Sequence, residues 1–408
     1  MTSSILRYVV IFVCFFTLAQ VKAQETNAPK FGKGLFNLVG KDSTFSMKVG
    51  LRFQSLATSQ WDADNGLTNP ETSMFIRRSR LKFDGFAFSP KLKYKLELGL
   101  SNRDQSGASQ YTSNAPRYIL DAVLKWNFSG NFVLWFGQTK LPGNRERVIS
   151  SQKLQMVDRS MVNSIFNIDR EMGVQLRGKF NAGSVIIKPM ASFSFGEGRN
   201  ITASNIGGFH YVGRVEVLPF GGFSSKGDYF GADLKREKAP KLALAASYSL
   251  NDGATRQKHT GRFLMNEDEE YLQHDLQTIF ADMMFKYQGF SLMGEYAHKI
   301  VSDKEVRDDA DLRLSILDAD GRSYYTGSGF NLQAGYLFKK NLEVSARYTS
   351  IMPDTEVSFA GTKEYTLGLS KYIVGHSLKL QSDVSFFNPE EIGASNELRY
   401  RLQMEFQF

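Results

Sequence analysis

Cysteine is almost absent from this sequence of 408 residues, and long apolar runs are rare. The one cysteine, Cys14, lies in an apolar run near the N-terminus, so a chain without that run has no disulfide, thiolate metal site or cysteine nucleophile. The mean hydropathy is −0.29, and no second apolar run is long enough to cross a bilayer as a helix. These absences exclude a disulfide-stabilised domain and a bundle of membrane-spanning helices.

The N-terminal apolar run has the features of a secretory signal. Arg7 precedes it, residues 8–19 form it, and residues 21–23 (VKA) follow at the positions that a signal peptidase reads. A membrane-spanning helix, the alternative, needs roughly 20 apolar residues, whereas this run has about 12. We therefore expect a cleaved signal peptide at 1–23, a periplasmic N-terminal segment at 24–43 and export from the cytoplasm.

A strict alternation of apolar and polar residues is the main feature that is present. In residues 397–408 (ELRYRLQMEFQF), apolar and polar residues alternate without a break. Similar segments occur at 45–54, 91–100, 118–128 and 342–348. Period two places one kind of side chain on each face of a strand, and segments near ten residues suit a tilted transmembrane strand. The pattern predicts about sixteen such strands.

Short turns and long polar loops alternate between these segments, which is typical of an antiparallel barrel in an outer membrane. A sheet in lipid must close, because an open edge would leave backbone N–H and C=O groups without partners. We predict an all-β fold over 44–408, a transmembrane antiparallel β-barrel with long external loops that is wide enough for a water-filled channel. The soluble alternative, a β-sandwich or propeller, would need short strands at close spacing or internal repeats. One connection, 219–240, is longer than the short turns at its end of the barrel.

Basic residues dominate the polar face of these strands, which would line the lumen. In the run 75–82 (FIRRSRLK), alternation places Arg78, Arg80 and Lys82 in one column that faces the lumen. The longest loop, 139–169, is the third external loop and is expected to fold inward and narrow the channel. The predicted anion-binding residues are Arg52, Arg78, Arg80, Lys82, Arg145, Arg147, Arg159 and Arg177. Two alternatives remain open: wall charges that only pair across strands, and a surface loop that contacts lipopolysaccharide.

Sequence signals of catalysis are missing. The five histidines show no metal-ligand spacing, and there is no nucleophile elbow, phosphate-binding loop or dinucleotide fingerprint. We therefore expect no enzyme activity, no cofactor and no metal, although an outer-membrane barrel enzyme or adhesin remains the alternative from another class. The formal net charge of +8 is mild. It gives no reason to expect nucleic acid as a partner, but it would favour anions in a pore.

Four stretches resemble one family. Residues 75–100 (FIRRSRLKFDGFAFSPKLKYKLELGL) are similar to the first hairpin of the phosphate-selective porin O and P family. Residues 133–147 (VLWFGQTKLPGNRER) and 169–174 (DREMGV) resemble its third-loop region, and residues 214–244 add support. The resemblance extends over essentially the whole chain after the predicted signal peptide.

The resemblance implies a sixteen-stranded homotrimeric porin whose basic lumen selects anions such as phosphate. Arg78, Arg80, Arg145 and Arg147 fall in the matching stretches, so the family's basic lumen positions are carried over to them. The wall here mixes lysine with arginine, and lysine lacks the planar fork that grips phosphate, so a general small-solute porin is the alternative. The terminal Phe408 is implied to be read by the barrel assembly machinery, and the outer face would contact membrane lipids and lipopolysaccharide.

Overall fold

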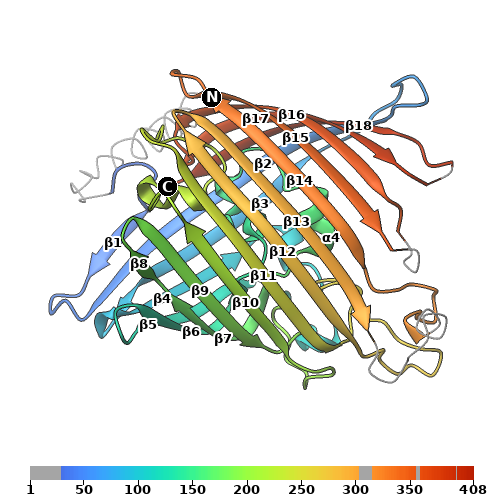
Figure 1. Ribbon diagram of the computed structural model, residues 1–408, viewed down its shortest axis with the longest axis horizontal. Coiled ribbons are helices and arrows are strands. Elements are labelled where there is room, and N and C mark those ends of the chain that lie inside the picture. The colour runs from blue at the N-terminus through green and yellow to red at the C-terminus, as the bar shows by residue number, and fades with distance from the viewer. Residues whose placement is uncertain (1–28, 303–314, 355–358, 392) are drawn as a thin grey trace, which may run out of the picture.

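The computed structural model describes residues 29–302, 315–354, 359–391 and 393–408, and the predicted signal peptide at 1–23 lies outside them. The described chain is mostly β-strand, with three short α-helices and three 3-10 helices (Figure 1). The helices are α2 (Asn102–Gln105), α3 (Arg145–Val148), α4 (Met161–Phe166), η1 (Gln110–Thr112), η2 (Ser151–Lys153) and η3 (Ser224–Tyr229). No helix among the described residues is long and apolar enough to span a bilayer.

Eighteen strands make up one antiparallel sheet. The first nine are β1 (Phe36–Val39), β2 (Phe45–Asp62), β3 (Glu71–Ala87), β4 (Ser89–Gly99), β5 (Ile119–Asn127), β6 (Phe132–Lys140), β7 (Arg170–Gly178), β8 (Phe180–Ala182) and β9 (Val185–Ser194). The others are β10 (His210–Leu218), β11 (Lys241–Ala254), β12 (His274–Tyr287), β13 (Phe290–Ser302), β14 (Gly327–Leu337), β15 (Leu342–Pro353), β16 (Thr362–Val374), β17 (Leu378–Pro389) and β18 (Glu397–Gln407).

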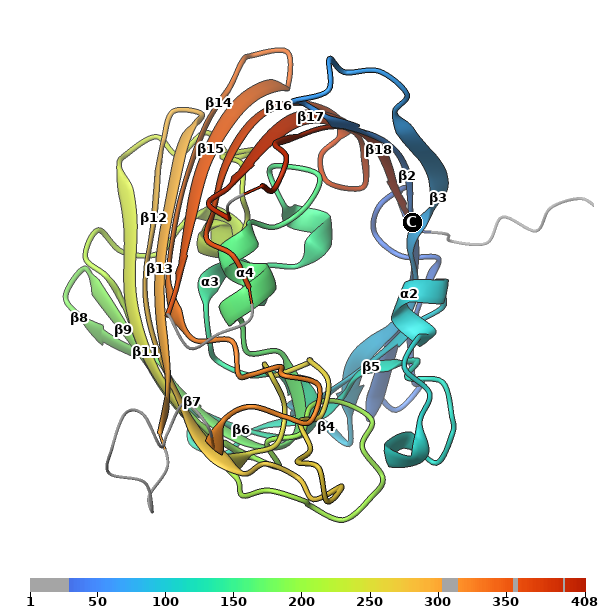
Figure 2. The same cartoon turned by 90° about the vertical axis from the view of Figure 1, so that its right-hand side faces the viewer.

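The sheet closes into a barrel because β18 pairs with β2 (Figures 1 and 2). The closing register runs from Glu397 opposite Asp62 to Gln407 opposite Arg52. Strands β7 and β8 both pair with β9 and together fill one position in the ring, whereas β1 adds to the edge of β2. The ring therefore has sixteen strands, which confirms the predicted fold class.

The alternation in the sequence becomes an inside-out distribution of side chains. On β18, Arg401, Gln403 and Glu405 are buried inside, while Leu402 and Met404 are exposed on the outer face. The same holds for most of β16, where the buried side chains include Glu364, Thr366 and Ser370 and the exposed ones include Leu367 and Leu369. The hydrocarbon interior of a membrane accounts for the apolar outer face, because so many exposed leucine and tyrosine side chains would be unfavourable in water.

The N-terminal segment contributes one strand of its own. Phe36 lies opposite Val49 and Val39 opposite Ser46, so β1 pairs with the part of β2 that β18 does not reach. The C-terminal backbone ends beside it, where the N–H of Phe408 donates to the carbonyl oxygen of Leu51 at 3.0 Å. Residues 36–39, part of the predicted periplasmic N-terminal segment, thus extend the sheet beside the C-terminus.

The main apolar core lies inside the lumen, where residues 141–169, here called the lumen loop, pack against the wall. Figure 2 shows α3 and α4 of this loop within the ring of strands. Val162 and Phe166 of α4 are buried against Phe280 and Ile351 of the wall, and α4 packs on β13, β14 and β15. The third long loop therefore folds inward, and it lies against one side of the barrel.

The long connection 219–240 enters the lumen from the opposite end. Phe223 packs in one apolar cluster with Ile149 and Leu154 of the lumen loop, and the N–H of Gly231 donates to the carbonyl oxygen of Lys153 at 2.8 Å. The buried Lys286 ammonium donates to three carbonyl oxygens of this connection at 2.7–2.9 Å. The extra length that is unusual for a turn thus supports the underside of the lumen loop.

Candidate functional site

A cavity of about 560 Å³ lies between the lumen loop and the opposite side of the barrel wall. We call it the arginine cavity. Fourteen arginine or lysine and five aspartate or glutamate side chains line it, which is an excess of nine cationic groups. The basic residues are Arg77, Arg78, Arg80, Arg103, Arg117, Lys140, Arg147, Arg159, Arg170, Arg199, Arg256, Lys258, Arg399 and Arg401, and the acidic ones are Asp104, Asp158, Asp169, Glu197 and Glu364.

A β-bulge brings two consecutive arginines into the cavity. Gln54 of β2 lies opposite Arg78 while Ser55 lies opposite Ile76, so Arg77 is the extra residue on β3. A bulge reverses the alternation of side chains, and both arginines therefore point inward. They meet the same carboxylate of the lumen loop, with nitrogen–oxygen distances of 2.9 Å from Arg77 to Asp158 and 3.3 Å from Arg78.

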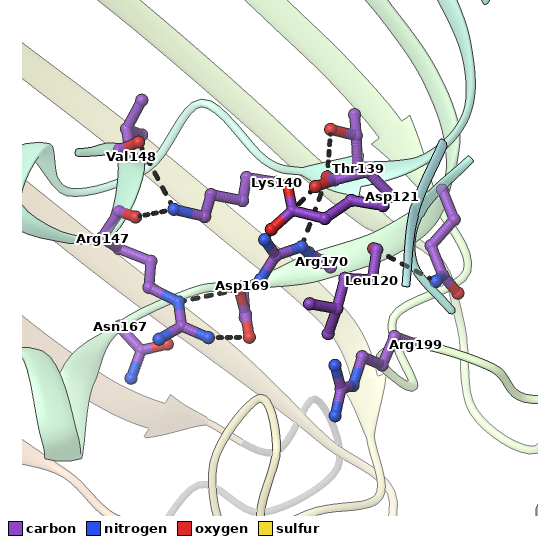
Figure 3. Close-up of polar contacts among 12 residues, drawn as sticks. Leu120, Asp121, Thr139, Lys140, Arg147, Val148, Asn167, Asp169, Arg170 and Arg199 are labelled. Carbon is purple, nitrogen blue, oxygen red and sulfur yellow. Dashed lines mark hydrogen bonds and ion pairs between the residues drawn. The ribbon is translucent and has the colours of Figure 1, made fainter. Parts of the chain in front are cut away.

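A second group of ion pairs lies along β5–β7 and the lumen loop (Figure 3). Arg170 lies 3.3 Å from Asp121 and 3.5 Å from Asp169, and Arg147 of α3 makes a two-pronged contact with Asp169. Figure 3 shows Arg147, Asp169 and Arg170 approaching one another from the lumen loop and the start of β7. Asp169 contacts two cations, and the ion pair between Asp121 and Arg170 joins β5 to β7.

Seven of the fourteen cavity cations have no carboxylate within 4 Å among the described residues. Arg159 instead donates to the carbonyl oxygens of Glu146 and Ile149 at 2.8 and 2.7 Å, and the Lys140 ammonium donates to that of Arg147 at 2.6 Å. Backbone carbonyls orient these groups without cancelling their charge. The seven are Arg103, Arg117, Lys140, Arg159, Arg199, Arg256 and Lys258.

The pKa values of loop residues reflect their burial and, to a lesser extent, the neighbouring charges. Burial lowers the pKa of Arg159 to about 10, with Arg80 adding to the shift and Glu146 opposing it. Burial and the neighbouring Arg170 likewise lower the pKa of Arg199 to about 10. Burial alone would raise the pKa of Asp158, but Arg77 and Arg78 outweigh it and hold that carboxyl well below its usual range. All these groups are charged at neutral pH, and an anion entering the cavity would relieve their repulsion.

Four of the eight predicted residues line the arginine cavity, namely Arg78, Arg80, Arg147 and Arg159. Arg145 lies outside it, although it shares α3 with Arg147. Its side chain is fully buried against the wall, with Nε 2.6 Å from Asp282 of β12, and the guanidinium is 3.7 Å from Glu216. One face of α3 is thus anchored to the wall and the other faces the cavity.

The remaining three predicted residues are engaged elsewhere. Arg52 donates to the Ser151 hydroxyl of the lumen loop at 2.7 Å and lies 3.5 Å from Glu405. Arg177 lies over the ring of Trp135 at 4.0 Å. Lys82, which alternation places in the column with Arg78 and Arg80, pairs with Asp84 at 2.8 Å and is 43% exposed. None of the three is among the residues that line the arginine cavity.

Several cavity residues were not predicted from the sequence. Arg77 is absent from the predicted lumen column of Arg78, Arg80 and Lys82, because alternation alone does not reveal a bulge. Arg103, Arg117, Arg199 and Arg256 lie in loops at the end of the barrel that carries the long loops, and their positions depend on contacts between distant segments. The sequence signal that these residues share is the presence of arginine in several long loops. That signal predicts a basic entrance at this end of the barrel.

The sequence profile described as phosphate-selective porin O and P matches residues 47–385. The chain belongs to this family. A protein of Aquifex aeolicus (strain VF5) described as uncharacterized is 24% identical over 373 residues, which cover 85% of this chain and 83% of that protein.

Solved structures of outer membrane proteins share the fold of this family member. The outer membrane channel DcaP of Acinetobacter baumannii matches with a TM-score of 0.54 at 14% identity, covering 91% of this chain and 99% of that one. OmpT of Vibrio cholerae, an outer membrane protein solved in a trimer form, matches with a TM-score of 0.52 at 10% identity, covering 88% and 99%. Family and fold together identify an outer-membrane porin.

Proposed function

We propose that this porin is an anion-favouring diffusion channel that admits phosphate among its solutes. The observation that carries the proposal is the excess of nine cationic side chains around the arginine cavity, half of whose cations have no carboxylate partner among the described residues. An anion that enters loses part of its hydration, and fixed positive charges offset that loss. A cation meets the same groups as a barrier.

The arrangement suits conduction more than tight binding. The cavity cations are spread over β3, β7, β18, the lumen loop and the loops at one end of the barrel, so an anion would exchange partners as it moves. Each contact at about 4 Å contributes roughly 1–4 kcal/mol, depending on the local dielectric. Several contacts of this size in sequence favour entry and still permit release.

The reversal potential under a salt gradient tests ion preference. The purified protein would be inserted into a planar bilayer with different potassium chloride concentrations on the two sides. We expect a reversal potential whose sign shows that chloride permeates more readily than potassium. A potential of the opposite sign would contradict the proposal.

Phosphate recognition needs its own measurement. Millimolar phosphate should reduce the chloride current, and Arg159→Gln should weaken this block about tenfold because one cation without a carboxylate partner is removed. Arg262→Gln is the matched control, since Arg262 is exposed and is not among the residues that line the cavity. A block that is equal in the wild type and in Arg159→Gln would leave a general small-solute porin as the better description.

The assembly and targeting that we propose follow from the family and from the sequence. We propose a homotrimer, which the trimer form of OmpT supports by analogy of fold. The cleaved signal peptide at 1–23, contacts of the apolar outer face with lipid and lipopolysaccharide, and recognition of Phe408 by the assembly machinery complete the proposal. No catalytic step is required of any residue in this function.

A further inference from the structure

Three side chains from distant segments meet at the edge of the arginine cavity and form a candidate metal site. Glu171 is near the start of β7, His210 begins β10, and His259 lies in the loop between β11 and β12. All three are buried, and their possible ligand atoms lie within 4.8 Å of one another. His259 also lines the cavity.

The distances from both histidines to Glu171 fit a single metal ion. Nδ1 of His210 and Nδ1 of His259 each lie 3.1 Å from Oε1 of Glu171. Ligands bound at about 2.0–2.1 Å in a tetrahedron around Zn²⁺ are separated by about 3.3 Å. Two histidines and one glutamate are also a ligand set that Zn²⁺ accepts, with its fourth position left to water or a solute.

His259 has a requirement that the described residues do not meet. Both of its ring nitrogens are buried and lack a hydrogen-bond partner among those residues, because the approach of Nδ1 to Glu171 has the distance but not the direction of a hydrogen bond. An unsatisfied buried imidazole is unfavourable. A metal ion between Glu171, His210 and His259 would satisfy it.

The surrounding contacts orient the other two ligands as metal ligands are usually oriented. His210 places Nε2 2.7 Å from the Ser249 hydroxyl, which leaves Nδ1 to face Glu171. The second carboxylate oxygen of Glu171 accepts from the backbone N–H of Gly196 at 2.9 Å. Such outer contacts fix the tautomer and direction of histidine and carboxylate ligands.

We propose that Glu171, His210 and His259 bind a divalent transition-metal ion, with Zn²⁺ as the best fit. Because His259 lines the cavity, the open coordination position would face the cavity, where water or an anion would complete the tetrahedron. The nearby Arg147 and Lys299 oppose a cation, so we expect affinity on the order of micromolar and not the tighter binding of a structural zinc site.

Zinc binding to the folded barrel tests the proposal without any reference to conduction. The protein would be treated with a chelator in detergent and titrated with Zn²⁺ by equilibrium dialysis, with gel mobility before and after heating as the check on folding. We expect one Zn²⁺ per chain. Because His259 lies in a loop, its replacement should not disturb the barrel. His259→Ala and Glu171→Gln should each weaken zinc binding at least about 100-fold. Ser249→Ala should weaken it about tenfold.

His298→Ala is the matched control, because His298 lies on β13 and bonds to Ser328 away from the cluster. Its zinc affinity should stay within about twofold of the wild type. The proposal is overturned if the folded wild type shows no saturable binding of one equivalent, or if His259→Ala binds Zn²⁺ as well as His298→Ala does. Neither result would bear on anion conduction, which the reversal potential decides separately.

Discussion

The lumen loop divides the barrel interior into two sides that treat arginine in different ways. On the packed side, Arg145 and Arg214 face Asp282 and Glu216, so two buried cations meet two buried anions. On the open side, fourteen cations and five carboxylates line the arginine cavity, and seven of those cations have no carboxylate partner among the described residues. The difference teaches that inward-pointing arginines serve two purposes here: some fasten the loop to the wall, and others leave their charge available to a solute.

The packed side combines charge pairing with apolar contact. The buried ion pairs are accompanied by the cluster in which Phe166 and Val162 pack against the wall, so the loop is held by both kinds of interaction. Gln155 adds hydrogen bonds to Ser291 and Glu343 at 2.8 and 2.7 Å. The position of the loop is therefore specified by the wall, and the cavity is the volume that the loop leaves unfilled.

The largest effect is expected when the packed side loses its central acid. Asp282→Ala leaves two buried guanidinium groups, Arg145 and Arg214, with Glu216 as their shared partner. An uncompensated buried charge costs about 3–5 kcal/mol, which should lower the free energy of unfolding measured with urea in detergent. Glu390→Ala is the control, because its pair with Lys363 is largely exposed and should contribute less than about 1 kcal/mol. Equal effects in both variants would remove the distinction between the two sides.

A smaller effect is expected from crowding the contact between α4 and the wall. A Cβ on Gly329 of β14 would lie 2.7 Å from the Phe166 ring, whereas a Cβ on Gly213 of β10 meets nothing within 4 Å. Gly329→Ala should therefore cost about 1–3 kcal/mol of unfolding free energy and loosen the lumen loop. Single-channel conductance should become larger or noisier than in Gly213→Ala. Quiet channels of wild-type conductance would show that the loop is not held at this contact.

The smallest effect is the response to salt. Raising the ionic strength from 0.1 to 1 M shortens the screening length from about 10 Å to about 3 Å. The anion-to-cation permeability ratio should fall, because solutes in the open cavity are screened. The screening of buried pairs such as Arg145 and Asp282 should change little. The loss of unfolding free energy in Asp282→Ala should therefore differ by less than about 0.5 kcal/mol between the two salt concentrations. A permeability ratio that does not depend on salt would argue against fixed charge as its cause.

The barrel could be predicted from the sequence because its signal is local. Alternation in 397–408 identifies the inner and outer faces of β18 without knowledge of its neighbours, and the count of such segments led to sixteen strands. The rule fails at Arg77, where one extra residue in β3 reverses the alternation. Nothing in the amino-acid sequence of β3 indicates the bulge, because the bulge is defined by the pairing of β3 with β2.

The candidate site could be predicted only in part because its geometry depends on the lumen loop. Arg145 and Arg147 are two residues apart and of the same type, yet the first contacts Asp282 and the second Asp169. Their separation follows from the turn of α3 and from a wall residue 137 positions away in the chain. Likewise, Glu171, His210 and His259 have no recognisable spacing in the sequence and meet only when the barrel has closed.

The reversal potential of a cavity variant, compared with an equal loss of charge elsewhere, tests the central claim most directly. Arg159→Gln combined with Arg199→Gln removes two cavity cations that have no carboxylate partner among the described residues, and Arg262→Gln combined with Lys238→Gln removes two exposed ones outside the cavity. We predict that the first pair lowers the anion-to-cation permeability ratio at least about fivefold while the second leaves it within about twofold. Equal shifts in the two variants would contradict the claim that the arginine cavity sets the ion preference.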